Sequence, residues 1–386
     1  MATPAGEPDD AARAARLAVG VVFLLQGLGA GNWFVRIPAV QAKLGLSAGL
    51  LGFSLLGIAA GSLLSMPLTG WAVTRVGSRP LVRVAVVSSM LALALPGLAP
   101  LPLLLLPALV VYGITAGMLD VSMNVQAVAV ELRYPRPLLS SFHAMYSIGG
   151  LLGAVLGGAV AALGIGPAAH LVTLGVVLAL VGLVATRRLL PARTEVRASG
   201  PAFARPSRAL AALGVIALCA LLCEGAMGDW SALYLDGTLG TGAGLAAAGY
   251  AAFSLAMAGG RLVGDRLSLR LGPPRLLRLA GLLVLAGLGA GLLLGDVPAA
   301  LVGFAATGAG LSAVFPITVS LAGGGRGEAN PGPAIAAVST TGYLGFLAGP
   351  PLIGLLAGQS SLRLALGVVP LLGGVISLLG GTLRKR

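Results

Sequence analysis

The sequence predicts an all-α membrane protein with twelve transmembrane helices, arranged as two pseudo-symmetric six-helix bundles. The 386 residues are 57% hydrophobic and only 10% charged, whereas a soluble domain carries about 25% charged residues. Apolar runs long enough to cross about 30 Å of hydrocarbon recur along the whole chain. The basic residues fall mainly between these runs.

This composition excludes several classes of protein. A mean hydropathy of +0.98 does not fit an ordinary soluble enzyme or a disordered chain, because so much apolar surface would meet water. The net charge is +13, which in a soluble protein would suggest nucleic acid. Between membrane spans, the same charge indicates orientation. The expected surroundings are therefore a lipid bilayer, and no nucleic-acid partner is expected.

The apolar runs predict one helix each, in twelve segments. The predicted spans are 17–35, 48–70, 81–97, 102–125, 139–162, 168–186, 209–234, 244–263, 276–294, 298–321, 334–357 and 363–382. The run that begins at residue 17 has no convincing cleavage site and is read as a retained span rather than a signal peptide. The chain then divides into a tail (1–16), a first bundle (17–186), a basic linker (187–208), a second bundle (209–382) and a tail (383–386).

The distribution of basic residues predicts the orientation. Alternating loops place 22 of the 25 Lys and Arg residues on the side of both termini. The other side receives only Arg36, Lys43 and Arg363. One missed helix would reverse every later loop, so this asymmetry supports twelve spans and cytoplasmic termini in a plasma or inner membrane.

The two halves resemble each other in sequence. The first span contains Gln26-Gly27 and then Asn32-Trp33, and the seventh contains Glu224-Gly225 and then Asp229-Trp230. The offset between these pairs is 197 or 198 residues, about half the chain. Looser matches join the second span to the eighth and the fifth to the eleventh. Repeated six-helix halves are typical of secondary transporters, whose substrate site lies between the repeats near the midplane.

Three acids fall inside predicted spans. An acid in hydrocarbon costs about 2.5–3.5 kcal/mol on insertion scales, so it normally faces a cavity or a partner. Asp120 has Asn124 one helical turn later, which predicts a polar strip, and its carboxyl group is suited to hold and release a proton. Glu224 matches Gln26 in the first half, and together they are expected to bracket a central cavity. A hydrogen-bonded structural role remains the alternative for Asp120, and an interfacial position is the alternative for Asp229.

Other polar and aromatic residues form a second group of candidates. The substrate-cavity candidates are Gln26, Asn32, Trp33, Asn124, His143, Asp229 and Trp230. Trp33 and Trp230 are interpreted as an interfacial belt or as aromatic platforms, with the belt favoured. A histidine such as His143 can titrate near neutral pH, but more often it caps a helix or forms a hydrogen bond. His170, at the end of the sixth span, is a weaker candidate.

The remaining features favour packing over chemistry. The pair Cys219 and Cys223 lies on one helix face without further ligands, so both are expected to be small core residues. Glycine stripes are expected to let helices approach closely, at Gly57/Gly61, Gly149/Gly153/Gly157 and Gly345/Gly349. Pro67, Pro316 and Pro350-Pro351 are expected to kink their helices. No nucleophile, metal or nucleotide motif appears, so neither an enzyme, a cofactor nor a metal site is expected.

Two loops resemble a known signature. Gly70 to Arg79 is similar to the cytoplasmic Gly-x3-Asp-Arg-x-Gly-Arg motif of the major facilitator superfamily, with Thr74 at the acidic position. The segment Gly260 to Arg266 carries the repeat copy with its acid, Asp265. The resemblance implies a cytoplasmic gate that includes Arg75, Arg79, Asp265 and Arg266, weakened in the first half by Thr74.

Two further segments resemble the fucose-permease-like or MosC-like branch of that superfamily. They are "GMLDVSMN" (117–124) and "GNWFVRIPAVQAKL" (31–44), the second with Asn32-Trp33 where the sugar porter has an acid. The resemblance implies a monomeric secondary transporter, with protons and a small, sugar-like solute as its partners. The alternatives are proton-driven efflux of an amphipathic compound and a transporter-like sensor that moves nothing. The fifth span lacks the Gly-Pro of drug antiporters, which disfavours efflux.

Overall fold

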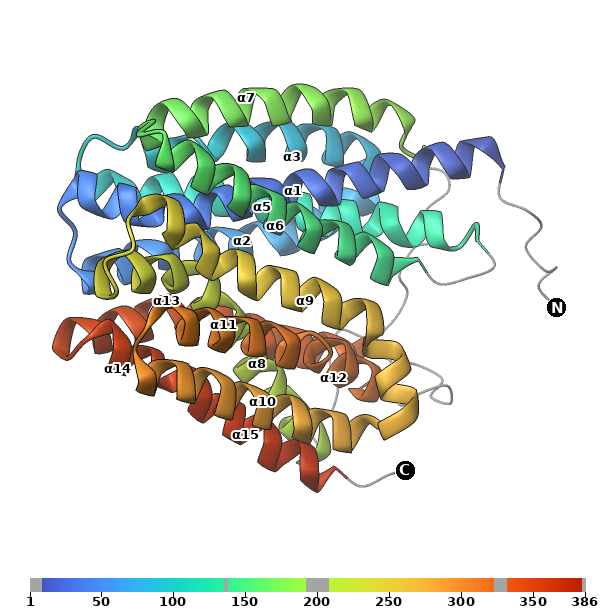
Figure 1. Ribbon diagram of the computed structural model, residues 1–386. Coiled ribbons are helices and arrows are strands. Elements are labelled where there is room, and N and C mark those ends of the chain that lie inside the picture. The colour runs from blue at the N-terminus through green and yellow to red at the C-terminus, as the bar shows by residue number, and fades with distance from the viewer. Residues whose placement is uncertain (1–8, 135–137, 192–207, 323–331, 384–386) are drawn as a thin grey trace. The chain divides into compact units, whose positions relative to one another are not determined.

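The computed structural model describes residues 9–134, 138–191, 208–322 and 332–383, and these are helical with short connections and no strand. The first half contains α1 (Asp10–Leu44), α2 (Ala48–Val76), α3 (Ser78–Ala92), α4 (Leu95–Leu98), α5 (Pro102–Glu131), α6 (Leu139–Ala162), α7 (Pro167–Ala185) and η1 (Thr186–Arg188) (Figure 1). The second half contains α8 (Arg208–Leu233), the π-helical turn η3 (Tyr234–Thr238), α9 (Ala243–Leu271), α10 (Pro273–Leu294), α11 (Val297–Leu311), α12 (Val314–Ala322), α13 (Gly332–Gln359), α14 (Leu362–Leu366) and α15 (Val368–Thr382).

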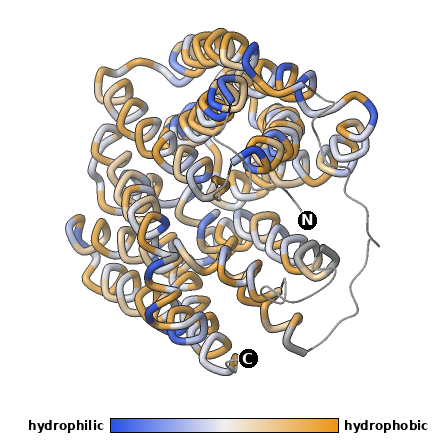
Figure 2. Tube along the Cα trace, turned by 90° about the vertical axis from the view of Figure 1, so that its right-hand side faces the viewer, coloured by the Kyte–Doolittle hydropathy of each residue, from blue (hydrophilic) through white to orange (hydrophobic). Residues whose placement is uncertain are grey.

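Twelve helical segments of the described chain are long and apolar enough to cross a membrane. This confirms the predicted number of spans. Hydrophobic residues predominate along these helices in the trace coloured by hydropathy (Figure 2). The chain separates into unit 1 (Met1–Gly45 with Ser54–Arg197) and unit 2 (Leu46–Phe53 with Ala198–Arg386). The division near residue 197 falls within the predicted linker, most of which lies outside the described residues.

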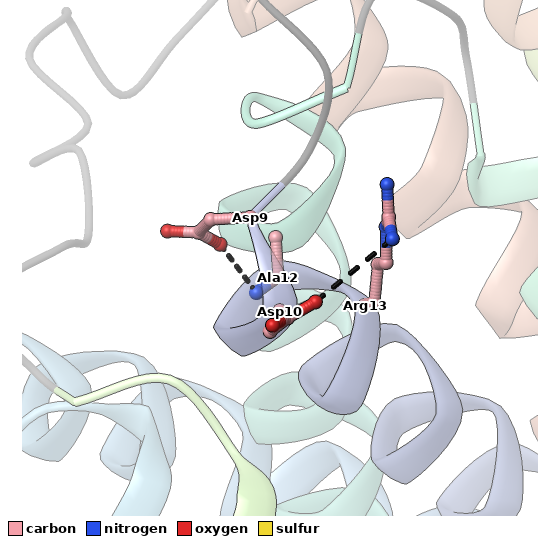
Figure 3. A network of polar contacts seen from close by, with 4 residues as sticks. All are labelled: Asp9, Asp10, Ala12 and Arg13. Atoms are coloured by element: carbon pink, nitrogen blue, oxygen red, sulfur yellow. Dashed lines mark hydrogen bonds and ion pairs between the residues drawn. The ribbon is translucent and has the colours of Figure 1, made fainter.

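The first helix is longer than the predicted span 17–35. It begins at an N-cap, where the Asp9 carboxylate accepts a hydrogen bond of 2.6 Å from the Ala12 backbone N–H (Figure 3). Arg13 and Asp10 form an exposed ion pair of 3.9 Å in the same turn. The helix ends at Gly45, whose φ of 61° is the left-handed conformation that terminates helices. Capping groups outside the apolar run, rather than hydropathy, therefore set both ends.

Three predicted spans are interrupted, each four or five residues before a proline. Breaks follow Ala92, Leu311 and Leu366, and prolines stand at positions 96, 316 and 370. A proline ring has no N–H for the carbonyl four residues earlier and collides with it, so the helix is broken there. Of the predicted kink sites, only Pro316 coincides with a break. Pro67 and Pro350-Pro351 lie inside continuous helices.

The glycine stripes form close helix contacts, as predicted. A Cβ at Gly149 would overlap the Leu24 carbonyl oxygen of α1, and one at Gly61 would overlap the Val110 carbonyl oxygen of α5. In unit 2, a Cβ at Gly345 would overlap the Leu218 carbonyl oxygen of α8. Thus α1 packs on α6 and α8 packs on α13, the first and fifth spans of each half. The sequence repeat corresponds to a repeated packing arrangement.

We expect Gly153→Ala to destabilise the protein by about 1–3 kcal/mol, as overpacking does in well-packed cores. The added methyl group would overlap the Leu28 carbonyl oxygen and lie 3.1 Å from the Asn32 backbone nitrogen. Gly70→Ala in α2 is the matched control, because a Cβ there meets nothing within 4 Å. Thermal unfolding of the two purified variants measures the difference. Equal melting temperatures would contradict close packing at Gly153.

Candidate functional site

The strip predicted in the fourth span forms on α5. The Asn124 side-chain amide donates to the Asp120 carboxylate (3.3 Å) and to the Asp120 backbone oxygen (2.8 Å). Both side chains are half-buried. Among the described residues, no cation forms an ion pair with Asp120. The strip thus holds a carboxylate in an apolar helix with a neutral donor beside it.

The glycine stripe of α5, formed by Gly113 and Gly117, leads to Asp120 and faces α2. A Cβ at Gly113 would overlap the Ile58 carbonyl oxygen, and one at Gly117 would lie 2.5 Å from the Ser65 hydroxyl and 2.7 Å from the Ser62 Cα. Asp120 continues this helical face by one further turn. Close packing of α2 on α5 therefore fixes the orientation of the helix that carries the acid.

Glu224 in α8 has a charged partner that the sequence did not indicate. Its carboxylate lies 3.5 Å from a guanidinium nitrogen of Arg261 in α9, and the two side chains are only 24% and 22% exposed. In the predicted charge distribution Arg261 belongs to the basic residues on the cytoplasmic side, and it also falls inside the predicted span 244–263. In the structure Arg261 lies within α9, which continues to Leu271, and inside a candidate span that ends at Gly264. Unit 2 thus contains an ion pair between two spans.

Gln26 occupies the position in unit 1 that corresponds to Glu224. Its side chain is half-buried, and its carbonyl oxygen is buried with no hydrogen-bond partner among the described residues. Gln26 and Glu224 belong to different units. Each is therefore a candidate within its own bundle, and the cavity expected between them stays a prediction.

Asn32 and Trp33 are buried in unit 1. Asn32 is 0% exposed, and its side-chain amide donates a hydrogen bond of 2.9 Å to the Leu28 carbonyl oxygen. Its own carbonyl oxygen has no partner among the described residues and faces Gly157 of α6. Trp33 and its counterpart Trp230 are each 1% exposed. The favoured interpretation of these two residues as a lipid-facing belt is wrong, because neither ring reaches the surface.

The end of α8 in unit 2 gathers further buried polar groups. Asp229 is 7% exposed, and no described residue donates to or pairs with its carboxylate. The Trp230 indole N–H and the Ser231 and Tyr234 hydroxyls are also buried without partners among the described residues. Tyr234 begins a π-helical turn, a feature frequent at functional sites. Sequence reasoning missed Ser231 and Tyr234, because hydroxyl groups carry no signal of burial.

The two histidines differ in exposure. His143 is exposed on α6, and its ring packs edge-on against Phe23 with centroids 5.2 Å apart. His170 is 6% exposed, and both of its ring nitrogens are buried without partners among the described residues. Cys219 and Cys223 are buried free thiols in α8, as predicted for core residues.

The gate candidates lie at helix ends. Arg75 is exposed, and its guanidinium carbon lies over the Trp71 ring, 5.3 Å from the ring centroid. Arg79 donates a hydrogen bond of 2.9 Å to the Arg187 carbonyl oxygen. Arg266 is exposed in the last turns of α9. The Asp265 side chain lies outside what the structure describes. Their role as a gate stays a prediction.

The comparisons with known proteins agree on the family. A sequence profile described as the Major Facilitator Superfamily matches residues 19–324. An uncharacterized MFS-type transporter of Yersinia pestis is 37% identical over 352 residues, 91% of each chain. The membrane protein MosC of Rhizobium meliloti is 32% identical over 368 residues, 93% of this chain and 88% of that protein.

A solved structure shares the fold. It is a bacterial homologue of the human lysosomal transporter Spinster in an inward-facing and occupied conformation, with a TM-score of 0.71 and 16% identity over 95% of each chain. With the twelve spans and the repeated packing of first on fifth span, these similarities identify the chain as a multi-pass membrane protein. It belongs to the Major Facilitator Superfamily of secondary transporters.

Proposed function

We propose that this protein couples the movement of a small solute to the movement of protons, with Asp120 as the proton-carrying group. The observation that carries the proposal is the setting of that carboxylate. It lies in a membrane span, has a neutral amide donor, and has no cation beside it among the described residues. A negative charge held in that setting is costly, and binding a proton removes the cost.

Unit 2 supplies the expected contacts to the solute. Glu224 and Arg261 offer hydrogen-bond acceptors and donors side by side between two spans. Intramembrane ionisable residues that pair with each other commonly mark substrate or ion pathways. These groups suit a hydroxylated, sugar-like solute. The fucose-permease-like branch suggested by the sequence is part of this proposal.

The protein is proposed to act in the bacterial inner membrane with both termini in the cytoplasm. The excess of basic residues in the loops on one side supports this orientation. The two units are proposed to alternate access to the solute by rocking, as repeat-built transporters do.

Proton movement in proteoliposomes tests this function. The purified protein is reconstituted with an internal pH dye, and sugars, polyols and amphipathic cations are added one at a time. We expect a pH change with a sugar or polyol, and its sign at known orientation separates symport from antiport. A response to amphipathic cations alone would replace the proposal with efflux. Solute uptake without any pH change would refute proton coupling.

A further inference from the structure

Unit 2 contains a groove between α10 and the pair α14–α15, and none of the residues of the proposed transport pathway lines it. Its volume is about 550 Å³, and ten of its eleven lining residues are Leu, Ala, Gly or Pro. Arg363 is the charged residue of the lining. The groove is open to the outside of the bundle, where Leu293, Leu364 and Leu371 are 81%, 70% and 68% exposed.

The shape of the groove follows from where these helices touch. Helices α10 and α15 run side by side (Figure 1). A Cβ at Gly281 would overlap the Gly373 carbonyl oxygen, so the helices meet closely there. At Gly289 an added Cβ would be 3.8 Å from the nearest atom, the Pro370 Cβ. The helices therefore diverge toward the C-terminal end of α10, and small residues leave the space between them open.

Arg363 is held at this open end. Its Nε donates a hydrogen bond to the Leu292 carbonyl oxygen, and one terminal nitrogen donates to the Leu293 carbonyl oxygen, both at 2.5 Å. These are two of the last carbonyls of α10. Gly295 leaves room for it, because a Cβ there would lie 2.9–3.0 Å from the guanidinium group. A guanidinium has five N–H donors, so further donors are available. No carboxylate of the described residues pairs with Arg363.

We propose that this groove binds one anionic phospholipid, with an acyl chain between α10 and α15 and the phosphate group on Arg363. The apolar lining on the outer surface of a membrane bundle matches an acyl chain. A fixed, exposed cation without a carboxylate partner matches a phosphate group, which accepts charge-assisted hydrogen bonds from arginine. A neutral apolar ligand would leave the guanidinium unused, and a soluble anion would leave the groove empty.

Tryptophan quenching by brominated lipids tests the proposal at the groove itself. Leu371→Trp places a reporter in the groove, in a Trp71→Phe background that removes the exposed native indole. Phosphatidylglycerol and phosphatidylcholine with the same brominated chains are compared at low fraction in liposomes of unbrominated phosphatidylcholine. Leu378→Trp, 74% exposed on the same helix but outside the groove, is the matched reporter.

We expect phosphatidylglycerol to be enriched about fivefold over phosphatidylcholine at Leu371→Trp, the preference that one cation near an anionic lipid supplies. At Leu378→Trp the two lipids should quench equally. Arg363→Gln should remove the preference, Arg363→Lys should keep most of it, and Gly289→Leu should reduce quenching by both lipids by filling the groove. Equal quenching at Leu371→Trp by the two lipids would overturn the proposal. A preference for phosphatidylglycerol that survives Gly289→Leu would also overturn it. Gly289→Leu keeps the proposal testable if Arg363→Gln fails to fold.

Discussion

Asp120→Asn is expected to reduce proton-driven solute accumulation to the level of protein-free liposomes. Asparagine keeps the size of the side chain and can still bond with Asn124, but it cannot exchange a proton. Solute exchange across the membrane needs no net proton movement, so counterflow should continue in this variant. Comparing counterflow with accumulation in the same proteoliposomes separates the coupling step from solute binding.

The matched control for this substitution is Asp10→Asn. Asp10 lies in the first turn of α1, and its side chain is fully exposed, so we expect normal accumulation and an unchanged dependence on pH. Normal, pH-dependent accumulation by Asp120→Asn would refute its role in proton coupling. Loss of both counterflow and accumulation in the folded variant would assign Asp120 to solute binding instead.

The number of membrane spans and their helical class could be predicted, because hydropathy alone determines them. Each span must satisfy its backbone hydrogen bonds in lipid, so every long apolar run becomes a helix. Helix ends follow other rules. The Glu131 carboxylate, for example, accepts 2.5 and 2.8 Å hydrogen bonds from the Leu138 and Leu139 N–H groups at the start of α6. That cap joins residues on either side of a loop, and nothing in the local pattern indicates it.

The three basic residues predicted on the outer side have a structural explanation. The Lys43 ammonium group donates hydrogen bonds of 2.8 and 3.0 Å to the Gly97 and Ala99 carbonyl oxygens at the end of α4. Arg36 donates to the Ile165 carbonyl oxygen, just after α6 ends, and Arg363 binds the last carbonyls of α10. Helix C-termini carry partial negative charge and attract cations. These exceptions to the charge asymmetry thus stabilise helix ends, a use that counting charges does not reveal.

The candidate site could be predicted only within single helices. Asp120 and Asn124 are four residues apart, so helical geometry alone brings them together. Glu224 and Arg261 are far apart in the sequence, and their contact depends on how α8 packs on α9. The burial of Trp33 and Trp230 also depends on packing within each bundle, which is why the lipid-belt interpretation failed.

Arg261→Gln is the variant expected to destabilise the protein most among the charged residues of unit 2. It leaves the Glu224 carboxylate in a membrane span without a cation among the described residues. We expect a loss of about 2 kcal/mol, between the values for exposed and for fully buried pairs. Thermal unfolding of the purified variant measures this loss, and Arg266→Gln, at an exposed position near the end of the same helix, is the matched control.

A second substitution distinguishes stability from transport. In Arg261→Gln/Glu224→Gln the isolated charge is gone, so unfolding should return toward the wild-type temperature, and the non-additivity measures the coupling between the two side chains. If the pair contacts the solute, this double variant will be stable and yet defective in counterflow. Wild-type counterflow by the stable double variant would make the pair purely structural. Additive losses of stability would contradict the interaction between Glu224 and Arg261.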